Sequence, residues 1–450
     1  MKTSVKKTAI IIGLIVLWQF LSYVIKNNIL FVGPVEVAKR LIEMSVQEIF
    51  WKSVLGSLFR ILVGFWIAFL LGYLCAFISG RFSLFEDIMW PLVSVFKSVP
   101  VASVVVLFLI WFGAKWLSVY VSFMVVFPNV YINLMEAVKK ADAKMLDMAK
   151  EYRLTYFRIW RYIIGESAMP LLIGAVRLSV GMSFKSGVAA EIIGLPEHSI
   201  GEQLYMSKIY IDTAGVLSWT LVVVLLCYIC EKVIIAFIIK LTELSMSCHK
   251  ALPVLSKDEC SDVVLKNIKL SYGEQTIFDD FSYRFGSGKS YVVTGESGQG
   301  KTSLLNLIRG SVNAEAGKIE GNNQLISMMF QEDRLVESMT ALDNLLLIRS
   351  EYKPDNIKKM LKELIPDIDF KKRISEYSGG MKRRVSLIRA IIASGQVLIL
   401  DEPFAGLDHD NKIKVMSFIT KYRRNRMLIL TSHDAEVFNN TDCDFDFLHI

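Results

Sequence analysis

Six apolar runs in the first half of the chain constrain its fold more than any other feature, because each run is long enough to cross a lipid bilayer. A transmembrane helix needs about 20 mostly apolar residues to cross a hydrocarbon core of about 30 Å. Apolar residues make up 53% of the 450-residue chain. The runs are Thr8–Ile25, Leu55–Ile78, Leu92–Phe112, Leu117–Met135, Leu171–Gly194 and Val216–Ile239. The sequence therefore predicts an N-terminal all-α transmembrane bundle of six spans within residues 1–241.

Lysine and arginine residues in the loops predict which side of the membrane each loop faces. The segment Ala137–Gly165 carries seven of these residues, whereas Leu195–Thr213 carries one lysine and three acids. Cytoplasmic loops are enriched in Lys and Arg, so we expect the first segment in the cytosol and the second outside. The net charge of +7 then follows from membrane topology. We expect the lipid bilayer as a partner and no contact with nucleic acid.

The sequence pattern changes after a polar segment at residues 242–261, which we interpret as a linker. From residue 262 to residue 450, short β-rich runs alternate with helix-like segments. This alternation is typical of an α/β domain with a mostly parallel sheet. The runs with strand character are Val263–Leu270, Tyr291–Thr294, Val397–Leu400 and Met427–Leu430.

The clearest chemical motif is Gly295–Thr302, GESGQGKT, which fits the P-loop pattern G-x-x-x-x-G-K-[ST]. A strand-like run precedes it and a helix-like run, Ser303–Ile308, follows. Its glycines allow backbone N–H groups to approach phosphate oxygens. Lys301 supplies a charge for the β- and γ-phosphates, and Thr302 supplies a hydroxyl group for Mg²⁺. The motif predicts an α/β P-loop ATPase domain.

Three downstream motifs suit the same chemistry. The buried-strand pattern before Asp401 predicts a carboxylate at a strand end, suited to the Mg²⁺ shell, and Glu402 suits polarising an attacking water. His433 follows another apolar strand and could reach a γ-phosphate. Ser378-Gly379-Gly380 precedes a basic helix whose N-terminus favours phosphate, although this spacing alone also fits an ordinary loop and helix cap.

Together these motifs resemble the nucleotide-binding domain of ATP-binding-cassette (ABC) transporters over residues 262–450. The resemblance implies that Tyr272 stacks on adenine, that Gln331 contacts Mg²⁺, that Glu402 is the catalytic base and that His433 is the switch histidine. It also implies that each ATP lies between the P-loop of one copy and the signature sequence, Tyr377–Met381, of a second copy. Thr302, Gln331 and Asp401 are the implied Mg²⁺ ligands. The predicted ATP-binding residues are Tyr272, Gly295, Glu296, Ser297, Gly298, Gln299, Gly300, Lys301, Thr302, Ser303, Gln331, Ser378, Gly379, Gly380 and Asp401.

The membrane half resembles the permease subunits of nitrate, sulfonate and taurine importers from about Phe31 to Ile239. The fragments that carry the resemblance include GPVEVAKRL, SLFRILVG, GAVRLSVGMSF and VAAEIIG. The cytoplasmic loop at about residues 137–165 matches the coupling loop of that family in length and position. Asp147-Met148-Ala149 stands where Glu-Ala-Ala is expected, and Arg153 stands where Gly is expected. The alternative for this stretch is a basic amphipathic helix on the lipid surface.

Four ionisable residues inside the predicted spans are candidates for the solute path, because such groups usually face the bundle interior. They are Arg60, Arg177, Lys185 and Glu191. At 100° per residue, Arg177 and Glu191 fall about 40° apart on one helix face, which predicts one inward-facing stripe. Three cations against one acid favour a polar or anionic solute, and structural pairing with neighbouring helices is an equal alternative.

The combined pattern predicts an ATP-hydrolysing importer in the cytoplasmic membrane of a prokaryote, with its ATPase domain in the cytosol. Because each ATP is expected to lie between two copies of the chain, the resemblance implies a homodimer. Import by this family also implies a separate extracytoplasmic solute-binding protein. Nitrate, sulfonates, taurine and a thiamine-precursor pyrimidine stay open as solutes. The nearest alternative is an ATP-driven half-exporter, disfavoured by the short loop Gly80–Pro91. A second alternative is an ATP-gated channel or sensor, which the presence of Glu402 disfavours.

Overall fold

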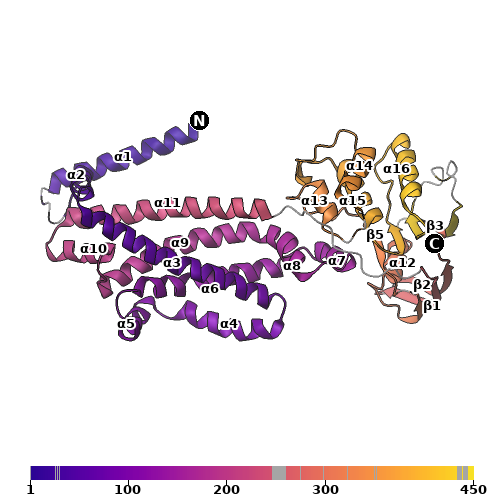
Figure 1. Ribbon diagram of the computed structural model, residues 1–450, viewed down its shortest axis with the longest axis horizontal. Coiled ribbons are helices and arrows are strands. Elements are labelled where there is room, and N and C mark those ends of the chain that lie inside the picture. The colour runs from indigo at the N-terminus through magenta and orange to yellow at the C-terminus, as the bar shows by residue number, and fades with distance from the viewer. Residues whose placement is uncertain are drawn as a thin grey trace. The chain divides into compact units, whose positions relative to one another are not determined.

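The computed structural model describes residues 2–25, 27, 29, 31–245, 260–273, 275–296, 298–321, 323–348, 350, 352–432, 438 and 444–450. The chain divides into two compact units (Figure 1). The helical unit comprises Met1–Lys140 and Ser167–Leu241, and the α/β unit comprises Ala141–Glu166 and Thr242–Ile450. The predicted coupling loop therefore belongs almost wholly to the α/β unit. Of the predicted linker, Thr242–Ser245 continues the last helix of the helical unit, and residues 246–259 lie outside the described residues.

The helical unit contains five helices that are long and apolar enough to cross a membrane, or six spans if one bent pair of helices counts as one. The prediction of an N-terminal helical membrane region is thereby confirmed. Its helices are α1 (Lys2–Ile25), α2 (Pro34–Ser45), α3 (Glu48–Ser79), α4 (Ser83–Ser98), α5 (Val101–Phe112), α6 (Leu117–Lys139), α9 (Gly165–Gly194), α10 (Ile200–Ile209) and α11 (Thr213–Ser245).

The third predicted span is wrong as a single helix. Helices α4 and α5 form a pair bent by 100° at their break, where Val99 has an extended backbone (ψ 130°) directly before Pro100. Proline lacks an N–H group and disfavours helical geometry in the residue before it. The predicted loop Gly80–Pro91 is also wrong in extent, because α4 already begins at Ser83.

Helices α3 and α6 pack closely at the centre of the helical unit. A Cβ atom added at Gly64 of α3 would lie 2.5 Å from the carbonyl oxygen of Val119 on α6. Farther along α3, a Cβ atom at Gly72 would lie 3.2 Å from the carbonyl oxygen of Phe127. Small residues at such contacts allow membrane helices to approach backbone to backbone.

The α/β unit contains two sheets. Strands β2 (Gln275–Phe285), β1 (Val263–Tyr272) and β4 (Ala316–Glu320) form an antiparallel sheet in that order. Strands β5 (Ile326–Met329), β6 (Val397–Leu400), β7 (Met427–Thr431), β3 (Ser290–Thr294) and β8 (Asp446–His449) form a parallel sheet in that order. The helices are α7 (Ala143–Glu151), α8 (Tyr156–Arg158), α12 (Lys301–Ile308), α13 (Ala341–Leu346), α14 (Pro354–Leu364), α15 (Gly379–Ile392) and α16 (His409–Tyr422), with a π-helix at Ile159–Ile164 and a 3₁₀ turn at Ile374–Glu376.

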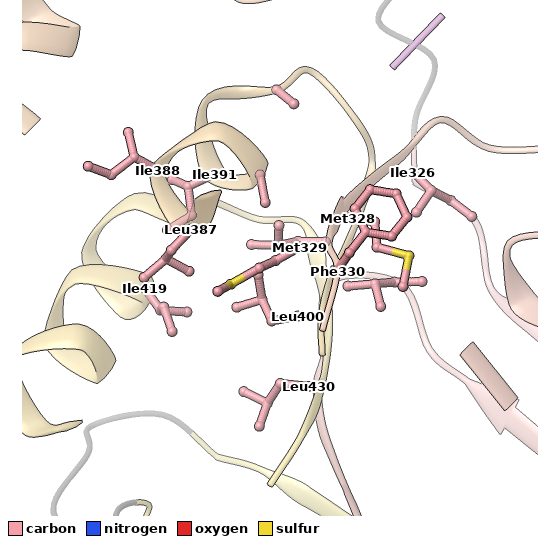
Figure 2. Packing of buried hydrophobic residues seen from close by; sticks show 14 of the residues in the cluster. Ile326, Met328, Met329, Phe330, Leu387, Ile388, Ile391, Leu400, Ile419 and Leu430 are labelled. Atoms are coloured by element: carbon pink, nitrogen blue, oxygen red, sulfur yellow. The ribbon is translucent and has the colours of Figure 1, made fainter. Parts of the chain in front are cut away.

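The parallel sheet forms the core of the α/β unit. Every residue of β5, β6 and β7 is buried, as expected for parallel strands covered on both faces. Successive side chains of β5 alternate between the two faces, so Met328 and Met329 point in opposite directions (Figure 2). Met329 packs beside Leu400 on the face covered by Leu387 of α15 and Ile419 of α16. These short apolar strands hold their carboxyl ends, which carry the polar motifs, at one edge of the sheet.

Candidate functional site

The P-loop follows β3, and the acidic pair follows β6. Both strands are hydrogen-bonded to β7 in parallel register, with Val293 opposite Thr431 and Leu400 opposite Leu430. Ligands of open α/β sheets bind outside the carboxyl ends of such strands. The sheet order therefore brings Gly295 and Asp401 to neighbouring positions on either side of the end of β7.

The P-loop backbone requires glycine at its start and end. Gly295 has φ 152° and Gly300 has φ 105°, values in the region that favours glycine. A Cβ atom at Gly300 would also lie 2.5 Å from Cγ2 of Ile277 on β2. The loop thus packs directly against the antiparallel sheet and turns into α12.

The side chain of Lys301 is hydrogen-bonded to backbone carbonyl groups of the P-loop. Its Nζ atom donates hydrogen bonds of 2.8 Å to the carbonyl oxygens of Gly295 and Glu296, and its side chain is buried. Thr302 is exposed in the first turn of α12, where the free N–H groups and the helix dipole favour anions. Gly298, Gln299 and Ser303 complete the described part of the loop, and the predicted Ser297 lies outside the described residues.

Asp401 and Glu402 are joined through Thr431, the last residue of β7. The Thr431 hydroxyl group donates to Oδ1 of Asp401 at 2.9 Å and accepts from the backbone N–H of Glu402 at 2.8 Å. Burial of Asp401, which is 4% exposed, raises the pKa of its carboxyl group, and the bond from Thr431 opposes that shift. Glu402 has φ 49°, so its backbone turns sharply after the strand. The sequence motifs did not point to a role for Thr431.

Arg383, in the basic helix after the signature sequence, points inward rather than toward a phosphate. Its guanidinium group donates to the carbonyl oxygens of Gln331, Asp401 and Glu402 at 2.6 to 2.7 Å and to Phe330 at 2.8 Å. It also pairs with Asp333 at 3.5 Å. This one side chain therefore joins the segment of the predicted Q-loop glutamine to the acidic pair, a role that the sequence pattern alone did not indicate.

The signature sequence is open to solvent in a single copy of the chain. Ser378 is the N-cap of α15 and accepts a bond from the N–H of Met381 at 3.4 Å. Ser378, Gly379 and Gly380 are exposed, and Cβ atoms added to the two glycines would meet nothing within 4 Å. Tyr377 is buried, with its hydroxyl group bonded to the carbonyl oxygen of Asp369 at 3.2 Å.

Two further predicted site residues have exposed side chains. Tyr272 is 50% exposed at the end of β1, two residues beyond Leu270, which pairs with Phe278. Cζ of Phe278 lies 3.2 Å from the Cβ position of Gly300, so strand β2 packs against the P-loop. Gln331 follows β5 and is exposed. His433 lies outside the described residues.

These residues fit a magnesium nucleotide. Asp401 supplies one carboxylate and Thr302 one hydroxyl group, the oxygen donors that Mg²⁺ combines with phosphate oxygens. Among the described residues no group of three or more His, Cys, Asp or Glu side chains could hold a metal by itself. A site of this kind depends on the phosphates to complete its coordination.

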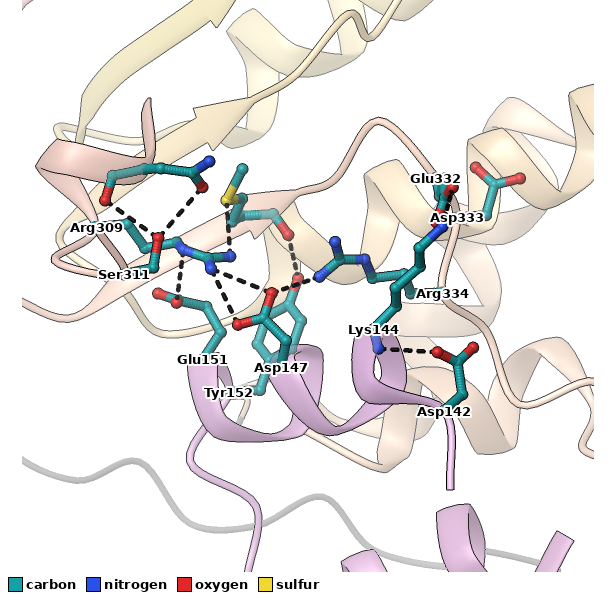
Figure 3. Close-up of polar contacts among 12 residues, drawn as sticks. Asp142, Lys144, Asp147, Glu151, Tyr152, Arg309, Ser311, Glu332, Asp333 and Arg334 are labelled. Atoms are coloured by element: carbon teal, nitrogen blue, oxygen red, sulfur yellow. Dashed lines mark hydrogen bonds and ion pairs between the residues drawn. The ribbon is translucent and has the colours of Figure 1, made fainter. Parts of the chain in front are cut away.

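A second site lies where α7 docks on the α/β unit, and an aspartate between two arginines is its centre (Figure 3). The Asp147 carboxylate accepts bonds from Nη2 of Arg309 at 3.0 and 3.1 Å and from Nη1 of Arg334 at 2.7 Å. Arg309 Nε also lies 3.5 Å from Glu151. Burial of Glu151 outweighs the attraction of Arg309 and raises the pKa of Glu151 to about 7.

Apolar contacts complete this docking. Met148, Ala149 and Tyr152 are buried in the core of the α/β unit, and the Tyr152 hydroxyl group donates to the carbonyl oxygen of Met328 on β5 at 2.7 Å. The alternative of a helix on the lipid surface is therefore wrong for this face of α7. Arg153 has φ 48°, a left-handed conformation that explains why glycine is expected at this position.

In the helical unit, Glu191 and Arg60 form a closed structural network. Glu191 is fully buried and accepts hydrogen bonds from Ser57 at 2.6 Å, from Ser118 at 2.9 Å and from the N–H of Gly201 at 3.3 Å. Arg60 pairs with it at 3.2 Å and also donates to the carbonyl oxygen of His198. The network ties α3, α6 and α9 to the start of α10, so structural pairing explains these two candidates.

The predicted single stripe of Arg177 and Glu191 is wrong. The Arg177 side chain is 61% exposed and pairs with Glu231 of α11 at 3.0 Å, whereas Glu191 is buried. Lys185 is exposed. The angular estimate placed the two residues only 40° apart, but packing against α3 and α6 covers the end of α9 that carries Glu191.

Comparisons with known proteins match both units. A family model described as "ABC transporter" matches residues 278–405, and one described as "Binding-protein-dependent transport system inner membrane component" matches residues 68–243. The aliphatic sulfonates import ATP-binding protein SsuB of Yersinia pestis bv. Antiqua is 31% identical over 187 residues, 38% of this chain and 67% of that protein. The taurine import ATP-binding protein TauB of Pseudomonas fluorescens is 34% identical over 197 residues, 40% of this chain and 75% of that protein.

A weaker similarity extends to solved structures. The dimeric structure of MJ0796, a bacterial ABC transporter cassette, is 20% identical in sequence. It covers 42% of this chain and 94% of its own, with a TM-score of 0.36.

Proposed function

This chain belongs to the ABC transporter family, with a permease and an ATPase fused in one polypeptide, and we propose from this premise that it imports a small polar or anionic solute as a homodimer. The chain is a multi-pass membrane protein in which ATP hydrolysis is coupled to transport. We also propose that the chain lies in the cytoplasmic membrane and that a separate extracytoplasmic protein binds the solute and delivers it to the dimer.

The docking of α7 is the observation that carries the proposal. Helix α7 lies between α6, which ends at Lys139, and α9, which begins at Gly165. The chain therefore leaves the helical unit, contributes buried side chains to the ATPase core and returns to the helical unit. We expect a movement of β5 to reach α7 through Tyr152, and a movement of Arg309 or Arg334 to reach α7 through Asp147. The backbone continues from α7 to two membrane helices.

The residues at the edge of the sheet support the proposed chemistry of hydrolysis. Lys301 binds the β- and γ-phosphates in place of its loop carbonyls, and Glu402 orients the attacking water and accepts its proton. Thr431 orients the Asp401 carboxylate, which together with Thr302 would hold Mg²⁺. Mg²⁺, when bound, neutralises the negative charge of the phosphates.

We infer the homodimer from the exposure of the signature sequence in a single copy of the chain. The P-loop lies at the carboxyl end of β3, while Ser378-Gly379-Gly380 is exposed and has open space around it. A second copy would place its own signature sequence over this P-loop, which gives two ATP sites for two permeases.

Import is preferred to export because residues 68–243 match the inner membrane component of binding-protein-dependent systems. Two similar ATP-binding proteins are named for sulfonate and taurine import. We therefore propose an organic anion or zwitterion of that size class, delivered by a binding protein.

The test uses the full chain in lipid nanodiscs with three proteins: wild type, Lys301→Ala and Glu402→Gln. We expect both variants to lose ATP turnover by at least about 100-fold, which is the loss of roughly 2.7 kcal/mol of transition-state stabilisation. Glu402→Gln should still bind a fluorescent ATP analogue and should become dimeric with ATP and magnesium, measured by mass photometry. A chain that stays single-copy with ATP, or turns over ATP unchanged without Lys301, refutes the proposal. An ATP-gated channel is distinguished because Glu402→Gln would still conduct ions.

A further inference from the structure

Three charged side chains lie on the surface of the helical unit within its apolar helices. Arg177 and Lys185 belong to α9, and Glu231 belongs to α11. Arg177 and Glu231 form an ion pair of 3.0 Å, with the Arg177 side chain 61% exposed. Both Lys185 and Glu231 lie within electrostatic range of Cys227 on α11, so the three charges share one neighbourhood.

Lys185 is deep in its membrane helix. The apolar run Leu171–Gly194 has Lys185 14 residues after its start and 9 before its end, about 21 and 14 Å at 1.5 Å per residue. This depth is too great for the side chain to lie among lipid headgroups, because the hydrocarbon core is about 30 Å thick. A charged side chain facing hydrocarbon at this depth is costly, so such residues face a bundle interior or a water-filled cavity.

The charges of Arg177, Lys185 and Glu231 do not sum to zero. Arg177 and Glu231 neutralise each other, whereas Lys185 has no hydrogen bond or ion pair with any residue that the structure describes. Two positions about one turn from Lys185 on α9 are small, although Met182 on the same face is 43% exposed. A Cβ atom added at Gly181, one turn before Lys185, would meet nothing within 4 Å, and the exposed Ala189 lies one turn after it. The ammonium group is therefore both unpaired and accessible.

We propose that this face of α9 lines an aqueous path through the transporter and that Lys185 binds the anionic group of the transported solute. A sulfonate, phosphonate or carboxylate group would supply the counter-charge that Lys185 lacks. The inference rests on the proposed transport function and deepens it by naming the residue and the charge of the solute. Arg60 and Glu191 are excluded from this role because they neutralise each other in a buried network.

The test measures water access and local charge directly, without knowledge of the solute. Ala189→Cys places a thiol one helical turn from Lys185, and Leu70→Cys places one at a position that is 62% exposed on α3 and carries no nearby charge on its own face. The full chain in nanodiscs is treated with the anionic reagent sulfonatoethyl methanethiosulfonate or its trimethylammonium counterpart. Peptide mass spectrometry then reads the rate at each cysteine separately, with the native cysteines left in place.

We expect Ala189→Cys to react at least about tenfold faster than Leu70→Cys and to favour the anionic reagent. One unit charge about 7 Å away in a water-like medium changes the ratio of the two reagent rates by roughly five- to tenfold. Lys185→Gln in the Ala189→Cys chain should abolish this preference, and Lys185→Arg should retain it.

Two results would overturn the inference. Equal slow labelling at positions 189 and 70 means that this face of α9 contacts lipid. Fast labelling at 189 with a reagent ratio that Lys185→Gln does not change means that Lys185 does not set the charge of the path. Neither result depends on ATP turnover, so failure here is distinguishable from failure of the proposed import function.

Discussion

Replacing Asp147 by asparagine should loosen the docking of α7 more than any other single change on that helix. Asp147 accepts three hydrogen bonds from Arg309 and Arg334, whose side chains are only 6% and 17% exposed. Asparagine removes the negative charge and leaves two nearly buried guanidinium groups facing a neutral amide. The substitution therefore destabilises the docked state mainly because the two arginines lose their carboxylate partner.

The expected magnitude follows from the burial of the three groups. Breaking a buried ion pair by removing one partner costs about 3–5 kcal/mol. Asp147 itself is 36% exposed, Arg309 keeps Glu151 nearby at 3.5 Å, and Arg334 keeps its stacking on Phe330 at 3.8 Å. We therefore expect a loss of about 2 kcal/mol, which is roughly a 30-fold increase in the population of undocked α7.

Hydrogen exchange of the amides in Ala143–Glu151 measures this population directly, because local opening sets their exchange rate. The matched control is Lys144→Ala on the same helix. It removes the Lys144–Glu332 pair, both of whose side chains are 56% exposed, and a pair of this kind contributes about 0–1 kcal/mol. We expect Lys144→Ala to change the exchange of α7 less than about fivefold.

Two outcomes would refute the reasoning. If Asp147→Asn leaves the exchange of α7 within about threefold of wild type, the arginines do not hold the helix. If Lys144→Ala accelerates exchange as much as Asp147→Asn does, the effect comes from helix fraying rather than from the buried charges.

Three further predictions test other contacts. Because burial raises the pKa of Glu151 to about 7, the docked state binds a proton that the undocked state loses above its ordinary pKa of about 4.5. Docking should therefore weaken as the pH rises from about 4.5 to 7, and Glu151→Gln should remove this dependence in hydrogen exchange corrected for intrinsic rates. Glu191→Gln should cost about 3 kcal/mol of stability by leaving Arg60 without a carboxylate partner, and should lower the midpoint of thermal unfolding in detergent by several degrees. An equal loss for Glu231→Gln, whose partner Arg177 is 61% exposed, would contradict this. Arg383→Lys should lower the ATPase kcat by roughly tenfold with little change in KM, because one ammonium group cannot bond four carbonyl oxygens as the guanidinium group does. An unchanged kcat would show that catalysis does not depend on these four hydrogen bonds.

Local patterns were sufficient where the physical cause is local. The apolar runs and the strands β3, β6 and β7 were predictable because hydrophobic length and periodicity act within one segment. The P-loop was predictable for the same reason, since its glycines, Lys301 and Thr302 lie within one turn between a strand and a helix. Strand β5 is as fully buried as β6 and β7 but was not predicted. The break at Pro100 was not predictable, because Pro128 and Pro170 lie inside continuous helices. Whether a proline breaks a helix depends on what packs around it.

Local sequence patterns identified an apolar helical half and a P-loop ATPase half within one chain. The partners of the polar side chains depend on tertiary packing. Asp147 meets arginines that are 162 and 187 residues away, Glu191 meets a serine 134 residues away, and Thr431 meets an aspartate 30 residues away. The physical reason is that a buried charge is stable only beside the groups that neutralise it. Those groups come from other elements, and their identity depends on how helices and strands pack.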